Sequence, residues 1–179
     1  MGWVAANAMP LNRRERALVA LAGVIPDVDG LGIIPEFLTA HSAHPLYWGS
    51  EFHHRLHTLA FAAVTAGACA ALATHRRRTA ALAFLSFHLH LLADLCGSRG
   101  PDGYQWPIPY LSPFSGAWNL TWPHQWQLNA WPNVAVTAVL LAATFRLAWS
   151  RGYSPAEMVS QNADRAFIAA LYNRFPRRA

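Results

Sequence analysis

The segment Phe87-His88-Leu89-His90-Leu91-Leu92-Ala93-Asp94 places two histidines and an aspartate within an apolar run from Thr79 to Cys96. Because Ser86, His90 and Asp94 are four residues apart, a helix would align them in one stripe. Burying a carboxylate among apolar side chains costs several kcal/mol unless a cation or hydrogen bonds compensate. A His-x-x-x-Asp pair can bind a metal ion. We therefore expect other segments to supply further ligands to this helix.

The composition favours a membrane-embedded chain. Hydrophobic residues make up 54% of the 179 residues and charged residues 13%, the latter about half the share usual in soluble domains. All 14 basic residues are arginines, and most lie at the ends of apolar runs, where they mark membrane orientation. No basic stripe is interleaved with aromatics, so nucleic acid is not an expected partner. Nothing marks a domain boundary, so residues 1–179 are expected to form one domain.

Two aspartates follow the first apolar segment. Ala17 to Ile25 is expected to form a helix that Pro26 ends, and Asp27 and Asp29 follow at once. Carboxylates at a helix C-terminus oppose the helix dipole, so this pair is unfavourable unless a positive group lies among them. A metal ion would remove the conflict. The alternative is a solvated turn at Asp29-Gly30.

Three histidines open the next apolar segment. His53, His54 and His57 are expected to start a helix that runs to about Thr74, and the 19 residues from Leu56 are about the length of a membrane span. In a helix His53 and His57 share one face, and His54 and His57 nearly do, so either pair could chelate one ion or the two could serve two. A solvent-facing patch at the membrane interface is the alternative interpretation.

This segment and the next helix are expected to form an antiparallel hairpin. Its tip, His75 to Arg78, is rich in arginine. The histidines that open the first helix then meet His90 and Asp94 near the end of the second, at the end opposite the tip. His88 points roughly opposite His90 on the helix and is expected to have a packing role.

The segment from Gly97 to Asn133 contains six of the twelve prolines and five of the eight tryptophans. It is expected to be an ordered loop at the membrane–water interface that covers the site end of the bundle as a lid. Within it, Arg99, Asp102 and His124 are able to contact an anionic or polar substrate, or else serve as structural hydrogen-bonding partners.

The expected fold is all-α: a polytopic membrane helical bundle with a long Trp- and Pro-rich ordered loop and a C-terminal amphipathic helix. Val134 to Ala148 supplies another apolar helix, and the tail from Ser150 to Ala179 is expected to lie on the membrane surface. Twelve of the fourteen arginines then lie on one side, leaving Arg55 and Arg99 with the site. The positive-inside tendency predicts that the site faces outward, towards the periplasm or its equivalent.

Imidazoles and carboxylates without thiolates suit zinc, manganese or iron. More than four candidate ligands predict a two-metal site, in which Asp27 or Asp29 would bridge the ions and a shared water would attack a phosphoester or acyl carbon. The remaining aspartate would orient a ligand or act as a general base. The sequence lacks Gly-x-Ser-x-Gly, P-loop and dinucleotide-binding motifs, so it gives no support to serine hydrolases, P-loop nucleotidases or dehydrogenases.

Four stretches resemble the bacterial inner-membrane-associated metal-dependent hydrolases, a family also labelled LexA-binding. They are residues 26–32, 53–57, 90–94 and 97–104, and the likeness extends from about Arg14 to Phe175. In motif layout the family is similar to zinc-dependent phospholipase C, in which a helical His-x-x-x-Asp and a preceding Asp bind a zinc cluster. The resemblance implies one to three divalent ions, zinc being the first candidate, bound by Asp27, Asp29, His57, His90 and Asp94, with His53 or His54 joining them.

We therefore expect a metal-dependent hydrolase of the bacterial inner membrane that cleaves an ester or phosphoester bond in a lipid or small molecule. Asp27, Asp29 and Arg55 are the expected catalytic residues, and membrane lipids are expected partners. The alternative is a non-catalytic, metal-stabilised membrane binding or scaffold protein. Closed four-coordinate geometry would favour that alternative, and an open coordination position facing a cleft would favour the hydrolase.

Overall fold

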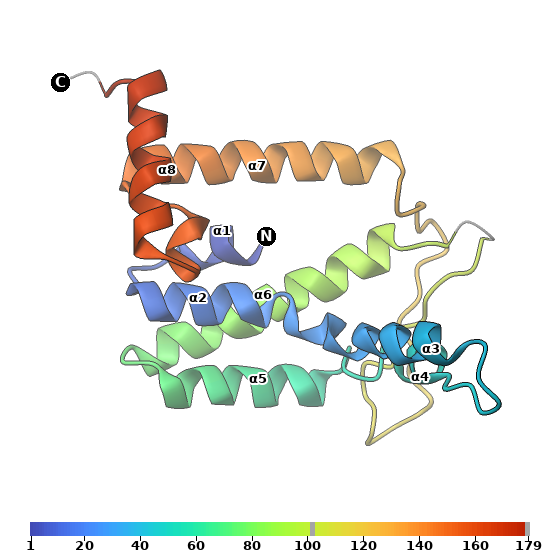
Figure 1. Cartoon of the computed structure of the whole chain (residues 1–179). Coiled ribbons are helices and arrows are strands. Elements are labelled where there is room, and N and C mark those ends of the chain that lie inside the picture. The colour runs from blue at the N-terminus through green and yellow to red at the C-terminus, as the bar shows by residue number, and fades with distance from the viewer. Residues whose placement is uncertain (101–102, 178–179) are drawn as a thin grey trace.

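The computed structural model describes residues 1–100 and 103–177, and every regular element in that part of the chain is a helix. Figure 1 shows α6 and α7 extending between two ends of the molecule, with α2 and α5 near the end that α8 crosses and the loop residues 103–130 at the other. The all-α prediction is confirmed. The elements in chain order are α1 (Gly2–Ala6), α2 (Arg13–Ala22), the 3-10 helix η1 (Ile25–Gly32), α3 (Ile33–Thr39), α4 (Trp48–Phe52), α5 (Leu59–Leu72), α6 (Arg76–Gly97), α7 (Trp131–Arg151), the 3-10 helix η2 (Pro155–Met158) and α8 (Gln161–Arg174).

The predicted hairpin of α5 and α6 is present, and α1 and α2 pack against it. Small side chains let these helices approach closely: Val19 and Ala22 of α2 share a buried core cluster with Cys69 of α5 and Ala83 of α6. A Cβ atom added at Gly23 would lie 2.5 Å from Oγ of Ser86 and 3.3 Å from the carbonyl oxygen of Ser86, so α2 and α6 approach closely here. This close approach holds the end of α2, and η1 after it, beside α6.

The predicted helix from Ala17 to Ile25 has different limits. An Asn12–Glu15 capping box starts α2, which ends at Ala22. Pro26 lies in the first turn of η1, where the missing N–H has no partner to lose. Asp27 and Asp29 therefore lie within a 3-10 helix and not in a turn after a helix.

The predicted continuous helix from the histidine cluster to Thr74 is wrong. The chain is irregular from residue 53 to 58, and α5 has only 14 residues, which is short for a membrane span. Thr58 caps α5 by accepting a hydrogen bond from N–H of Phe61 at 3.1 Å. His54 has a φ of 73°, outside the helical region. The histidine cluster is therefore a loop, and its helical spacing does not decide which side chains meet.

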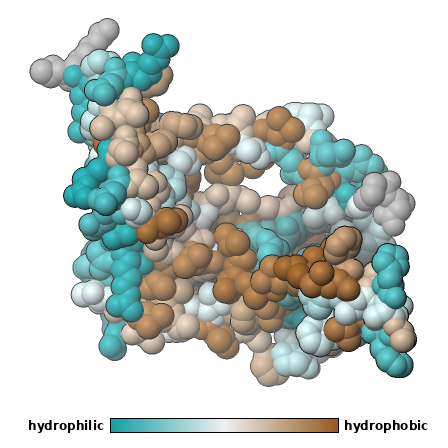
Figure 2. Space-filling model, in the orientation of Figure 1, coloured by the Kyte–Doolittle hydropathy of each residue, from teal (hydrophilic) through white to brown (hydrophobic). Residues whose placement is uncertain are grey.

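Within residues 1–100 and 103–177, two helices are long and apolar enough to cross a membrane. They are α6, with 22 residues and a mean hydropathy of 1.5, and α7, with 21 residues and 1.4. α2 together with η1 and α3 is a third candidate, bent by 50° at the break between them. Apolar side chains of α7 are widely exposed, among them Val134 and Val139. Figure 2 shows this apolar surface between a hydrophilic end at α8 and the loop end.

The arginine-rich elements lie at one end of the molecule. The starts of α2 and α6 and the end of α7 meet there beside α8, whereas the histidine loop and the lid lie at the other end (Figure 1). Ile168 and Leu171 of α8 pack against Ala148 of α7. A buried ion pair between Arg16 and Glu157, with an N–O distance of 2.5 Å, ties η2 to α2 at the same end.

Candidate metal centre

Ligand atoms from three separate elements meet at the loop end of the molecule. Asp27 comes from η1, His57 from the loop before α5 and His90 from α6, and one ligand atom of each lies within 4.8 Å of the others. Nε2 of His90 lies 3.3 Å from Oδ1 of Asp27, and Nε2 of His57 lies 3.7 Å from it. The two Nε2 atoms are 3.3 Å apart. The predicted convergence of distant segments is therefore seen for these three side chains.

Asp94 adds a fourth ligand atom. Its Oδ2 lies 3.1 Å from Nε2 of His90, one helical turn away, and 3.3 Å from Nε2 of His57. That oxygen is buried and accepts no hydrogen bond. Orphaned buried carboxylate oxygens are costly, and a cation between the two carboxylates and the two imidazoles would satisfy this one. The donor set of these four residues thus fits a divalent metal ion.

Asp29 lies on the other side of His57. Its Oδ2 is 3.6 Å from Nδ1 of His57, and its Oδ1 is 3.2 Å from Nδ1 of His53. It also accepts a hydrogen bond from N–H of Leu56 at 2.9 Å. Its side chain is 5% exposed. Asp29 therefore holds the histidine loop through Leu56 and His53. It lies beside Nδ1 of His57, while Nε2 of that ring faces the other ligands.

His53 and His54 stack on each other, with ring centroids 4.0 Å apart, and neither belongs to the group formed by Asp27, His57 and His90. Both ring nitrogens of His54 are buried without a hydrogen-bond partner. Burial, with His53 and His57 close by, lowers the pKa of His54 to about 4, so its ring is neutral. His54 faces Trp106 at a centroid distance of 4.3 Å. The choice between His53 and His54 as a further ligand remains a prediction.

The carboxylates control the charge of His57. Burial alone would lower the pKa of this histidine, but Asp27, Asp29 and Asp94 outweigh it and raise the pKa to about 10. Without a metal, the ring is therefore a cation at neutral pH. A divalent ion at the same place would take over the role of that proton.

The centre is buried on one side and open on the other. His57 is fully buried, whereas the side chain of Asp27 is 52% exposed. The exposed side gives water or a substrate access to the cluster. Structural metal sites are closed by their ligands, and catalytic sites keep an open position.

Residues 1–172 match the model of the YdjM inner membrane protein family. The chain belongs to this family. The family description and the long apolar helices agree on a membrane protein. No curated protein and no solved structure matches the chain. The description of the YdjM family names no reaction. The chemistry of this member is therefore inferred from its own residues.

The described part of the predicted loop, residues 98–100 and 103–130, contacts the site end of this YdjM-family chain. Gln125 donates a hydrogen bond of 2.6 Å to the carbonyl of Asp94, and N–H of Leu59 donates one of 2.8 Å to the carbonyl of Tyr110. Trp106 lies against the rings of both His53 and His54. The density of tryptophan and proline predicts such a lid, but the pattern does not single out Trp106 as the residue that touches the histidines.

Two of the other predicted substrate contacts, Arg99 and His124, make contacts within the lid. Backbone N–H of Arg99 pairs with the carbonyl of Trp126, and the ring of His124 packs on Trp122. Asp102 lies outside the described residues. His88 bonds to the carbonyl of Phe84 and the hydroxyl of Tyr110. These contacts agree with the packing role predicted for His88.

Arg55 belongs to the histidine loop and lies beside His53 and His54. It is exposed, and its Nε donates a hydrogen bond of 3.3 Å to the carbonyl of Glu51. Together with His53 and His54 it lines a cavity under the lid. Its position fits substrate binding, while its predicted catalytic role stays a prediction.

Proposed function

We propose that this chain is a metal-dependent hydrolase of the inner membrane that cleaves an ester or phosphoester bond. The observation that carries the proposal is the four-residue cluster of Asp27, His57, His90 and Asp94 with its exposed side at Asp27. Two imidazoles and two carboxylates suit zinc, and also manganese or iron. A divalent ion bound there would supply a water molecule that ionises near neutral pH.

The side chains around the cluster have separate tasks in this proposal. Asp29 faces Nδ1 of His57 at 3.6 Å, which leaves Nε2 of that ring for the metal. Asp27, on the exposed side, is placed to accept a proton from an attacking water at a carboxylate oxygen. Trp106 and the rest of the lid limit the access of bulk water from above the histidine loop.

The proposal also includes an arrangement in which the chain crosses the membrane more than once. In this proposal α6 and α7 cross the bilayer, and α2 with η1 and α3 forms a broken third span. The arginine-rich end lies in the cytoplasm by the positive-inside tendency, so the cluster faces outward. His90 is fourteen residues after Arg76, which places it about 21 Å from the cytoplasmic end of α6. Membrane lipids therefore surround the site, which lies in the outer half of a hydrocarbon core about 30 Å thick.

The test uses the full chain purified in detergent with its native metal content. Hydrolysis of p-nitrophenyl phosphate, bis-p-nitrophenyl phosphate and p-nitrophenyl butyrate is measured with zinc, manganese or a chelator present. We expect activity on at least one compound, lost with the chelator and in His90→Ala, and kept in His88→Ala. A protein that binds metal but cleaves none of the three would contradict the hydrolase and favour the scaffold alternative.

A further inference from the structure

A cavity whose wall contains several polar side chains lies under the lid, next to the histidine loop. It has a volume of about 510 Å³. Arg55 is the only arginine in its wall, and Tyr104, Ser112 and Asn119 add hydroxyl and amide groups. Guanidinium, hydroxyl and amide donors together are the groups that bind phosphate oxygens in proteins. We call this space the lid cavity.

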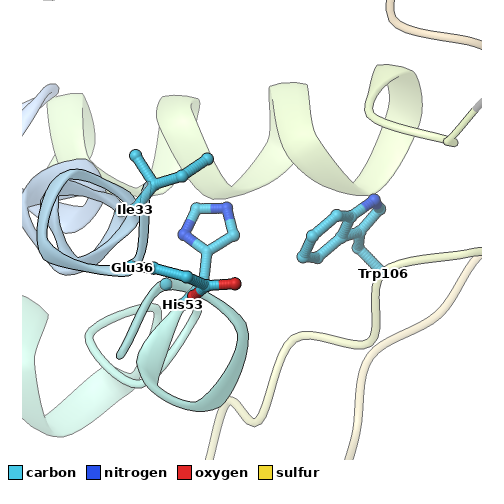
Figure 3. Close-up of a pocket in the computed structure, with 6 residues that line it drawn as sticks. Ile33, Glu36, His53 and Trp106 are labelled. Atoms are coloured by element: carbon cyan, nitrogen blue, oxygen red, sulfur yellow. The ribbon is translucent and has the colours of Figure 1, made fainter. Parts of the chain in front are cut away.

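A smaller pocket of about 210 Å³ adjoins the lid cavity, because His53 and Trp106 line both. Its other walls include Ile33 and Glu36 of α3. Figure 3 shows the ring of His53 between these α3 side chains and Trp106.

The smaller pocket continues onto an apolar surface. Ile33 is 64% exposed, and Phe37 and Leu38 of the same helix are 80% and 75% exposed. Figure 2 shows an apolar strip over η1 and α3. In an inner-membrane protein such a strip lies against lipid. The lid cavity and an apolar face are thus joined at His53, beside the metal centre.

We propose that the substrate of the site is an anionic phospholipid. Its phosphate binds in the lid cavity at Arg55, and its acyl chains leave through the smaller pocket along α3. The proposal rests on the hydrolase function and narrows its substrate to a lipid phosphoester. Arg55 selects the charge, and Ile33 contacts the apolar part.

The experiment measures binding, so that it does not depend on turnover. The full chain in detergent is titrated with dihexanoyl phosphatidate, with dihexanoylglycerol, which has no phosphate, and with glycerol 3-phosphate, which has no acyl chains. Tryptophan fluorescence reports binding at Trp106, and Trp106→Phe shows which part of the signal comes from it. We expect the phosphatidate to bind at least about tenfold more tightly than either fragment, because only it makes both the charged and the apolar contacts.

Matched variants separate the two contacts. Arg55→Gln is expected to weaken phosphatidate binding by about tenfold, and Arg55→Lys by less, because a charged hydrogen bond is lost only in the first. Arg77→Gln removes the same charge from an exposed position at the arginine-rich end and should change nothing. Ile33→Ser should weaken binding of the phosphatidate and leave glycerol 3-phosphate unaffected. Circular dichroism of each variant confirms the fold, and Arg55→Lys still tests the charge if Arg55→Gln does not fold.

Three results would overturn the proposal. Equal affinity for dihexanoylglycerol would exclude selection of the phosphate, and equal affinity for glycerol 3-phosphate would exclude an amphiphile in favour of a soluble phosphoester. Unchanged binding in Arg55→Gln would exclude the lid cavity as the phosphate site. The same titrations in His90→Ala keep this test separate from the hydrolase proposal, because they need no bound metal.

Discussion

Oδ2 of Asp29 lies 3.6 Å from Nδ1 of His57, while Nε2 of the same ring lies 3.3 Å from Oδ2 of Asp94. One imidazole thus connects an orienting carboxylate to the candidate metal centre. Histidines that bind metals commonly donate their second ring N–H to a carboxylate, which fixes the ring and increases its basicity. This relationship assigns Asp29 a role different from that of Asp27.

Substituting Asp29 by asparagine tests that role. We expect Asp29→Asn to weaken metal affinity by about 10- to 100-fold while the number of ions bound at saturation stays the same. Competition with a chromophoric chelator measures both quantities. Asp27→Asn, which removes a ligand oxygen itself, is the comparison. A lower stoichiometry in Asp29→Asn would instead make Asp29 a direct ligand.

Metal binding is expected to depend on pH. The pKa of His57 is raised to about 10 in the metal-free protein, because the surrounding carboxylates outweigh its burial. A metal must displace that proton, so affinity should rise as the pH increases from about 6 to about 9. Calorimetry in two buffers with different ionisation heats measures the protons released. Binding without proton release would show that His57 is not a ligand.

The buried ion pair at the arginine-rich end is expected to stabilise the fold. The side chains of Arg16 and Glu157 are 10% and 5% exposed. Glu157→Ala leaves the guanidinium buried without its partner and should lower the free energy of unfolding by about 3–5 kcal/mol. Unfolding in mixed detergent measures this, with the exposed Glu51→Ala as the control. Equal losses in the two variants would refute the role of the pair.

Fusions to the C-terminus and labelling of a cysteine at position 44 test the membrane orientation. A fluorescent protein fused to the C-terminus should fluoresce, and alkaline phosphatase fused there should be inactive, because the arginine-rich end is expected in the cytoplasm. In a variant without Cys69 and Cys96, the substitution His44→Cys introduces a single cysteine. This cysteine should react with an impermeant reagent added outside the cell. An external C-terminus would reverse the proposed orientation of the site.

The helices that depend on local pattern could be predicted from the sequence. The apolar run bounded by arginines gives α6, and the four-residue spacing brings Asp94 to within 3.1 Å of His90. The histidine cluster could not be predicted in the same way. Its segment would be helical by pattern, but Asp29 binds the backbone of Leu56 and Thr58 caps the next helix. Contacts between distant segments therefore override the local preference.

The sequence pattern also could not predict which of the two aspartates in η1 has which role. Asp27 and Asp29 are two residues apart, and pattern alone treats them as equivalent ligands. Which nitrogen of His57 each carboxylate faces depends on the orientation of the ring in three dimensions. The contact of Trp106 with His53 and His54 likewise depends on the path of the lid, which lacks the periodicity of a helix.

The metal content of the purified protein tests the central claim most directly. Elemental analysis of the detergent-purified chain after exposure to zinc should find at least one bound ion in the wild type and in His88→Ala. The ion should be lost from His90→Ala and from Asp94→Ala, whose side chains face Nε2 of His57. Equal metal content in all four proteins, or none in the wild type, would contradict a shared cation at Asp27, His57, His90 and Asp94.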